Sequence, residues 1–220
     1  MNDRGILQAG VGRVVITPPV GIRMMGYTVQ ECVSESIERD LTATALILAD
    51  GTTQVVMIAC DILFIQNPHV DQIRESVGEA IGISADHVLI NTSHTHLGPM
   101  LPGWQADTPQ QDELQQNYLT MLTESVVSVA TMAAGRLQPA RIGADTGHAR
   151  IGINRRERLP AGGIVIGDNP EGPVDHDVGV IRIDDLSGKP IATVMTAAAH
   201  TIVLGPKTSQ LSPDYVGPAR

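Results

Sequence analysis

Two apolar runs separated by a short polar turn constrain the fold of this chain more than any other feature. Residues 41–49 and 55–62 are rich in Ile, Val, Leu and Ala, and Asp50-Gly51-Thr52 lies between them. An Asp-Gly pair between apolar runs is a strong signal for a β-hairpin, so we expect two antiparallel strands here.

A helix and a further strand are predicted directly after the hairpin. Apolar residues recur at helical spacing over residues 70–81, following Asn67-Pro68, and Gly82 ends the pattern. Residues 88–90 then form a short apolar run that is typical of a buried strand. A hairpin, a crossover helix and another strand therefore follow in order.

The rest of the chain continues this alternation. Residues 112–135 form the longest predicted helix, and apolar runs predict strands at residues 11–16, 140–149, 162–167, 178–184 and 191–199. Because helices interleave with strands while hairpins also occur, we expect an α/β fold: mixed parallel and antiparallel sheets flanked by helices, in a layered α/β sandwich. A single domain over residues 1–220 is expected at this length. Residues 98–109, which include Trp104, are predicted to form a loop and one wall of a cleft.

Composition excludes several classes of function. The net charge is −9, and Lys189 and Lys207 are the only lysines, which argues against nucleic-acid binding and against electrostatic adsorption to anionic membranes. No run approaches the length of a transmembrane segment, and the start of the chain has no apolar core of a signal peptide. We expect a soluble protein, cytoplasmic or secreted if an upstream leader is missing, and the sequence fixes no oligomeric state. Cys60 lies within an apolar run and is interpreted as a small buried hydrophobe.

Histidines occur at the ends of two predicted strands. His94 and His96 follow the run at residues 88–90, and His200 follows the run at residues 191–199. Alternate strand residues face the same side, so the rings of His94 and His96 can address one point. An H-x-H pair can also be incidental, but its recurrence at a second strand end favours a metal site. The remaining histidines are interpreted as solvated or capping residues: His69, His87, His148 and His176.

Two charged residues have both a functional and a structural interpretation. Asp61 ends an apolar run and could either orient a ligand imidazole or cap a turn. Arg155 belongs to the charged segment 154–158, a pattern that is usual for a solvated face.

Six groups of short motifs, spread over nearly the whole chain, occur in the order found in one protein family. They are residues 9–13 (AGVGR) with 16–21 (ITPPVG) and 25–27 (MGY), then 91–99 (NTSHTHLGP), 152–155 (GINR), 178–180 (VGV), 199–200 (AH) and 212–217 (SPDYVG). On these motifs the chain resembles the neutral (non-lysosomal) ceramidases and their shorter bacterial relatives. Leu97 departs from the ceramidase pattern, where Ser is frequent, and this leaves the substrate open.

The resemblance implies a zinc-dependent amidase that cleaves the N-acyl bond of a ceramide-like lipid, giving a fatty acid and an amino alcohol. His94 and His200 would be the zinc ligands, while His96 and Arg155 would lie beside the metal and contact the substrate or the developing oxyanion. Such chemistry suits Zn²⁺, which lowers the pKa of bound water to about 7 and polarises a carbonyl. A guanidinium near the oxyanion adds charge stabilisation.

The same resemblance implies that this chain carries only part of the site. The family's Glu and Tyr zinc ligands, and a serine-bearing segment, lie downstream of the motif at residues 212–217, so we expect a C-terminally truncated domain with little activity alone. Asp214 lies in that motif, although Ser-Pro-Asp is also ordinary turn chemistry. Two alternatives remain: a catalytically silent binding or assembly module, and a hydrolase of a non-lipid amide or ester.

Overall fold

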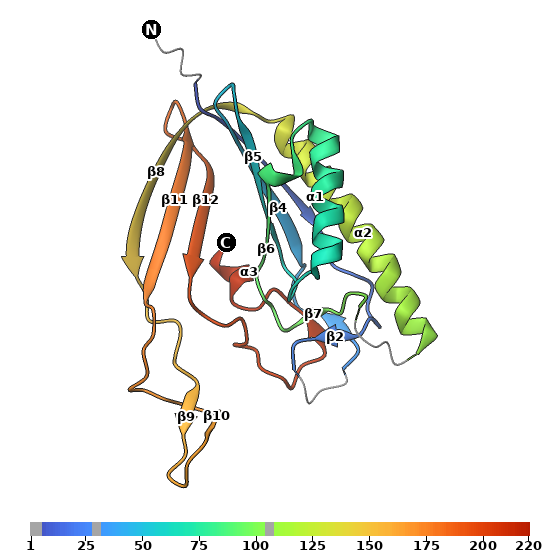
Figure 1. The fold of residues 1–220 in the computed structure, drawn as a ribbon, viewed down its shortest axis with the longest axis vertical. Helices are drawn as coiled ribbons and strands as arrows, with labels where there is room; N and C mark the ends of the chain where they lie inside the picture. Colours follow the sequence, from blue (N-terminus) through green and yellow to red (C-terminus); the bar gives the residue numbers. More distant parts are fainter. Residues whose placement is uncertain (1–5, 28–31, 104–107) are drawn as a thin grey trace. The chain divides into compact units, whose positions relative to one another are not determined.

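The computed structural model describes residues 6–27, 32–103 and 108–220, which fall into two compact units (Figure 1). The first unit comprises Met1–Ala140 and Thr201–Arg220, and the second comprises Arg141–His200. The single domain expected over residues 1–220 stays a prediction. Trp104, predicted to line a cleft, lies outside the described residues.

A mixed sheet forms the centre of the first unit. Its strands, in spatial order, are β1 (Gln8–Val15), β4 (Thr42–Ala49), β5 (Gln54–Cys60) and β6 (Val88–Thr92). The β1–β4 and β4–β5 pairs are antiparallel, whereas the β5–β6 pair is parallel. This confirms the predicted mixed α/β fold.

The turn between β4 and β5 has the predicted hairpin chemistry. The Oδ1 atom of Asp50 accepts hydrogen bonds from the backbone N–H groups of Thr52 (3.0 Å) and Thr53 (2.8 Å). Gly51 has a φ of 89°, a conformation that a residue with a side chain adopts only under strain. Local sequence therefore fixes the register of these two strands.

Helix α1 (Asn67–Ile81) makes the crossover that the parallel pair β5 and β6 requires. Pro68 lies in its first turn, and Gly82 ends it in the left-handed conformation with its N–H bonded to the carbonyl of Gly78. The predicted helix is confirmed and begins three residues earlier than its apolar pattern. A short 3₁₀ turn, η1 (Ala85–His87), leads into β6.

Helix α2 (Pro109–Ala134) packs closely against the same sheet. Thr108 caps its N-terminus by accepting a hydrogen bond from the N–H of Gln111. A Cβ atom on Gly12 of β1 would lie 2.6 Å from the carbonyl oxygen of Val129, so glycine permits this approach. Figure 1 shows both long helices on one face of the sheet. Among the described residues, no helix is both long and apolar enough to cross a membrane.

Two short strand pairs and a short helix complete the first unit. Strand β2 (Met24–Met25) pairs antiparallel with β7 (Gly98–Pro99), and β3 (Ser36–Ile37) pairs parallel with β13 (Gln210–Leu211). Helix α3 (Val216–Ala219) follows β13. The β2–β7 pair brings the segment after Met25 beside the H-x-H motif.

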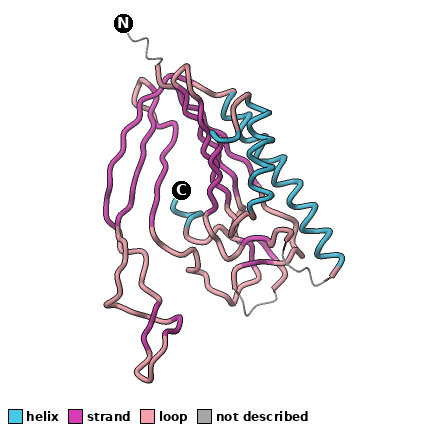
Figure 2. Tube along the Cα trace, viewed as in Figure 1, coloured by secondary structure: helices cyan, strands magenta, loops and turns pink. Residues whose placement is uncertain are grey.

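The second unit consists of strands and loops (Figure 2). Strand β8 (Gln138–His148) starts beside β1 and continues into this unit, where β11 (Asp177–Asp185) lies between β8 and β12 (Pro190–Ala197). A separate hairpin joins β9 (Arg156–Arg158) to β10 (Ile164–Ile166). The predicted strands at 140–149, 178–184 and 191–199 are confirmed. The charged segment 154–158, interpreted as a solvated face, contains β9.

Candidate metal centre

The segment that carries His94 is fixed by carbonyl groups just beyond the end of β5. The N–H of Ser93 donates to the carbonyl of Cys60 (2.9 Å), and the N–H of His94 donates to that of Ile62 (3.1 Å). The Oγ1 of Thr92 donates to the carbonyl of Leu63 (3.1 Å). Because β5 and β6 are parallel neighbours, both strands deliver their ends to this one place.

The imidazole of His94 has a defined tautomer. Its Nδ1 lies 3.0 Å from the carbonyl oxygen of Leu63, which can only accept a hydrogen bond. In the neutral ring Nδ1 therefore carries the proton, and Nε2 is the nitrogen that can act as a ligand. A backbone carbonyl that accepts from one imidazole nitrogen is the usual support for a histidine whose other nitrogen binds a metal.

The backbone of His94 is strained. Its φ is 59°, and within the described ranges His94 and Asp214 are the non-glycine residues with positive φ. Such a conformation costs on the order of 1–3 kcal/mol and is found preferentially where function requires it. Both residues are candidate site residues from the sequence.

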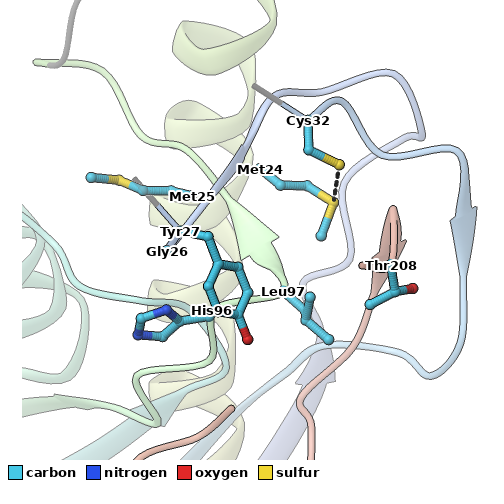
Figure 3. Close-up of a pocket in the computed structure, with 8 residues that line it drawn as sticks. All are labelled: Met24, Met25, Gly26, Tyr27, Cys32, His96, Leu97 and Thr208. Carbon is cyan, nitrogen blue, oxygen red and sulfur yellow. Dashed lines mark hydrogen bonds between the residues drawn. The ribbon is translucent and has the colours of Figure 1, made fainter. Parts of the chain in front are cut away.

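The ring of His96 stands between His94 and Tyr27. Its centroid lies 5.0 Å from that of His94 and 5.0 Å from that of Tyr27, and both pairs meet edge to face. A Cβ on Gly26 would lie 2.5 Å from the Cβ of His96, and the φ of Gly26 is 148°. Glycine at position 26 therefore makes room for the histidine, as Figure 3 shows from the close approach of the two segments.

A small pocket lies against His96 (Figure 3). Its lining is largely apolar, with Met24, Met25 and Leu97 beside the histidine, and Thr208 on the far side. The thiol of Cys32 donates to the sulfur of Met24 at 3.9 Å. With a volume of about 10 Å³, the pocket has room for about one water molecule next to the imidazole.

The chain on the C-terminal side of His200 is bonded to the H-x-H segment. Thr201 donates through its Oγ1 to the carbonyl of Ser93 (2.7 Å) and accepts at its own carbonyl from the N–H of His96 (3.4 Å). His200 ends the second unit and precedes Thr201 by one peptide bond. His200 is therefore joined by one peptide bond to a residue that bonds the H-x-H segment.

Asp214 organises the loop that follows Thr201. Its buried carboxylate accepts hydrogen bonds from the N–H groups of Val203 (3.1 Å) and Leu204 (2.9 Å), and its own N–H donates to the Oγ of Ser212 (2.9 Å). The carbonyl of Ser212 in turn accepts from the Oγ1 of Thr95 (2.7 Å). Asp214 therefore acts on loop conformation, whatever its effect on a metal.

Asp61 is buried at the end of β5 and has partners other than an imidazole. Its Oδ2 accepts from the N–H and the Oγ1 of Thr42, each at 2.9 Å. The guanidinium of Arg220 pairs with both carboxylate oxygens and bonds Thr42 as well. Asp61 thus fixes the strand end from which Ile62 and Leu63 hold His94. The neighbouring Cys60 is buried, and this burial raises the pKa of its thiol to about 12, as expected for a packing residue.

Arg155, the other predicted catalytic residue, lies in the second unit immediately before β9. Its carbonyl accepts from the N–H of Gly167, which closes the base of the β9–β10 hairpin. Its role beside a metal stays a prediction. His148, in the same unit, is exposed and its Nδ1 lies 2.8 Å from a carboxylate oxygen of Asp177.

The first unit thus brings His94 and His96 together and supports them with Asp61 and Asp214. Sequence reasoning missed the carbonyl of Leu63, the hydroxyl of Thr201 and the ring of Tyr27 as supports. Gly26 and Tyr27 belong to a motif that the resemblance had marked, and this was the one available signal for them. The roles of Leu63 and Thr201 depend on contacts that leave no local pattern.

Comparison with known proteins gives consistent results along the chain. It is 26% identical to neutral ceramidase A of Dictyostelium discoideum over 99% of its own length and 32% of that protein's. The fold resembles a structure described as ceramidase complexed with C2 (TM-score 0.76, 19% identity, 95% of this chain and 33% of that one). It also resembles the neutral ceramidase of Pseudomonas aeruginosa (TM-score 0.73, 19% identity, 96% of this chain and 35% of that one). The chain therefore spans about a third of the length of these relatives.

The family assignment rests on a match to the chain as a whole. The model of the neutral/alkaline non-lysosomal ceramidase N-terminal region matches residues 7–220. Its span includes the H-x-H segment, His200 and the Asp214 motif. The chain therefore belongs to the neutral/alkaline non-lysosomal ceramidase family, of which it represents the N-terminal region.

Proposed function

We propose that this chain forms the metal-binding part of a zinc-dependent amide hydrolase that acts on ceramide-like lipids. Family membership supports the hydrolysis of a lipid amide, as in the relatives named neutral ceramidases. The products would be a fatty acid and an amino alcohol. The hydrogen bond between Nδ1 of His94 and the carbonyl of Leu63 is the observation that carries the proposal.

The donor set fits zinc. His94, His96 and His200 form a group of possible metal ligands among the described residues. Imidazole nitrogen suits Zn²⁺, and with Nδ1 of His94 bonded to the carbonyl of Leu63 the ring would bind the ion through Nε2. We assign His94 and His200 as ligands. Zinc, when bound, would supply Lewis-acid polarisation of the amide carbonyl and an activated water.

The other side chains would serve the substrate and the geometry of the site. His96 and Arg155 would contact the scissile amide, where a cation or an N–H donor stabilises the charge that develops on the carbonyl oxygen. Asp61 and Asp214 would position the ligands indirectly, since each carboxylate holds backbone near a proposed ligand.

Zinc titration of the 220-residue chain with single variants tests the ligand assignment. We expect His94→Ala and His200→Ala each to weaken zinc binding by more than about a hundredfold, because a directly bound imidazole contributes more than its supports do. His96→Ala should retain affinity within about tenfold. His87→Ala, an exposed histidine at the end of η1, is the matched control and should bind as the parent does.

Hydrolysis of a short-chain fluorescent ceramide tests the reaction itself. With added zinc we expect slow turnover by this chain, lost in His96→Ala although zinc still binds. Because two histidines alone would hold zinc weakly, the deciding measurement is zinc binding by this chain joined to the remaining part of a family member. Absence of stoichiometric zinc in that longer protein would favour a silent binding module. Turnover of simple amides or esters with none of the ceramide would favour the non-lipid hydrolase.

A further inference from the structure

The β9–β10 hairpin presents two chemically different faces. Its antiparallel register pairs Arg158 with Ile164 and Arg156 with Ile166. Residues opposite each other on paired strands share a face, and alternate residues along a strand do so too. The resulting arginine–isoleucine face, defined by these four residues, carries two guanidinium groups and two branched apolar side chains. Val165 and its partner on β9 lie on the other face.

This face is unusually open to solvent. Ile166 is 84% exposed, the highest value for a large hydrophobic side chain that the structure describes, and Ile164 is 59% exposed. Arg156 and Arg158 are exposed as well, and among the described residues no carboxylate forms an ion pair with either guanidinium. Single exposed apolar residues are common, but two of them framed by two unpaired arginines on one short hairpin require a reason.

Local charge at the hairpin is opposite to that of the chain. The chain has a net charge of −9, whereas residues 155–168 contain three arginines against Glu157 and Asp168. The Debye length is about 8 Å at physiological salt, so a ligand on the arginine–isoleucine face responds chiefly to the charges of this segment, and Glu157 lies on the opposite face. A guanidinium pairs with phosphate through two parallel hydrogen bonds. The net charge of the whole chain argues against adsorption to anionic membranes, but that argument does not apply to this segment.

We propose that the arginine–isoleucine face of the β9–β10 hairpin docks on an anionic lipid surface. The two isoleucines enter the boundary between headgroups and acyl chains, and the two arginines pair with headgroup phosphates. This docking rests on the proposed function in one respect, because a ceramide-like substrate would lie in such a lipid surface. Arg155 precedes β9 directly, so docking would hold this proposed substrate contact at the lipid.

Co-sedimentation of the 220-residue chain with vesicles tests the docking. Phosphatidylcholine vesicles with and without phosphatidylglycerol contain no amide lipid, so the readout is independent of hydrolysis and of zinc. We expect binding that requires phosphatidylglycerol and weakens with added salt. Each arginine near an anionic surface should raise the partition coefficient about fivefold. The double variant R156Q/R158Q should therefore lower the partition coefficient by more than about tenfold. I164S/I166S should lower it by at least about tenfold.

The opposite face of the same hairpin provides the matched control. Val165→Ser alters a 41% exposed apolar residue on the same strand and should leave vesicle binding unchanged. Equal binding by both double variants and the parent, or no binding by the parent, would overturn the proposal. Self-association of the parent that disappears in I164S/I166S would also overturn it, since a second copy of the chain would then be the occupant.

Discussion

The two units are built with very different amounts of core. In the first unit the side chains that β4, β5, α1 and α2 turn toward one another are almost fully buried, including Ile47, Ile58 and Leu122. In the second unit Ile183 is the one side chain of residues 141–200 in the buried class. The first unit is thus held by packing, and the second mainly by strand pairing and turns.

This difference separates two tasks of the candidate site. His94 and His96 are attached to the well-packed unit, where carbonyl groups after β5 hold His94 and the carbonyl of Thr201 accepts from the N–H of His96. Arg155 belongs to the exposed unit, beside a hairpin with little packing of its own. Rigid support suits metal ligands, whereas segments that meet a ligand are drawn from the less stable parts of a protein.

The largest expected effect comes from emptying part of the core of the first unit. Leu122→Ala in α2 removes a fully buried side chain and should lower the free energy of unfolding by about 3–5 kcal/mol, because the close-packed sheet and helix cannot collapse into the cavity. Urea denaturation measures the change. Leu186→Ala, at a residue 58% exposed in the second unit, should cost less than about 0.5 kcal/mol. Similar losses for both variants would refute the contrast between the units.

Local sequence determined how well the elements of the first unit could be predicted. The hairpin around Asp50 and the helix ending at Gly82 carry their own turn and cap chemistry, and both were found. Strand β9 was missed because its three residues are charged and its pairing to β10 leaves no apolar alternation. The β2–β7 pair was missed because Gly98-Pro99 has the composition of a strand breaker.

The candidate site was predictable only where a motif stood at a strand end. His94 and His96 follow an apolar run, and the parallel β5–β6 pair explains why such an end is exposed to a ligand. The carbonyl of Leu63 bonds His94 from 31 residues away along the chain. The hydroxyl of Thr201 bonds the carbonyl of Ser93 from 108 residues away. Contacts of this kind form only in the completed fold, so no local sequence pattern predicts them.

An intermediate effect is expected at the glycine that admits His96. Gly26→Ala places a Cβ 2.5 Å from the Cβ of His96 and should destabilise the first unit by about 2–3 kcal/mol while displacing the ring. Thermal unfolding gives the stability, and the imidazole NMR signals of His96 report its displacement. Gly21→Ala is the matched control because its φ is 96° but nothing lies within 4 Å of the added Cβ. It should show the backbone strain alone, about 1 kcal/mol, with unchanged His96 signals.

The smallest expected effects come from two aspartate-capped turns of the same kind, one in each unit. The pKa of Asp50 is lowered to about 2, first by the N–H of Thr53 and then by the hydroxyl of Thr52. The pKa of Asp185 in the second unit is also lowered, first by the hydroxyl of Ser187 and then by the N–H of Lys189. Asp50 is exposed and Asp185 is partly exposed, so solvent screens both carboxylates and each contributes little.

The pH dependence of Asp50→Asn isolates this contribution. A carboxyl whose folded pKa lies below its unfolded value of 3.8 stabilises the protein fully above that value, and the stabilisation disappears as the pH falls toward about 2. The melting temperature of Asp50→Asn should therefore lie slightly below that of the parent at neutral pH and converge with it in acid, since asparagine retains an acceptor oxygen but no charge. Asp185→Asn should behave in the same way. If the Asp50→Asn difference stays constant from neutral pH to about pH 2, the charge of Asp50 has no part in holding the hairpin, and the turn depends on its hydrogen-bond geometry alone.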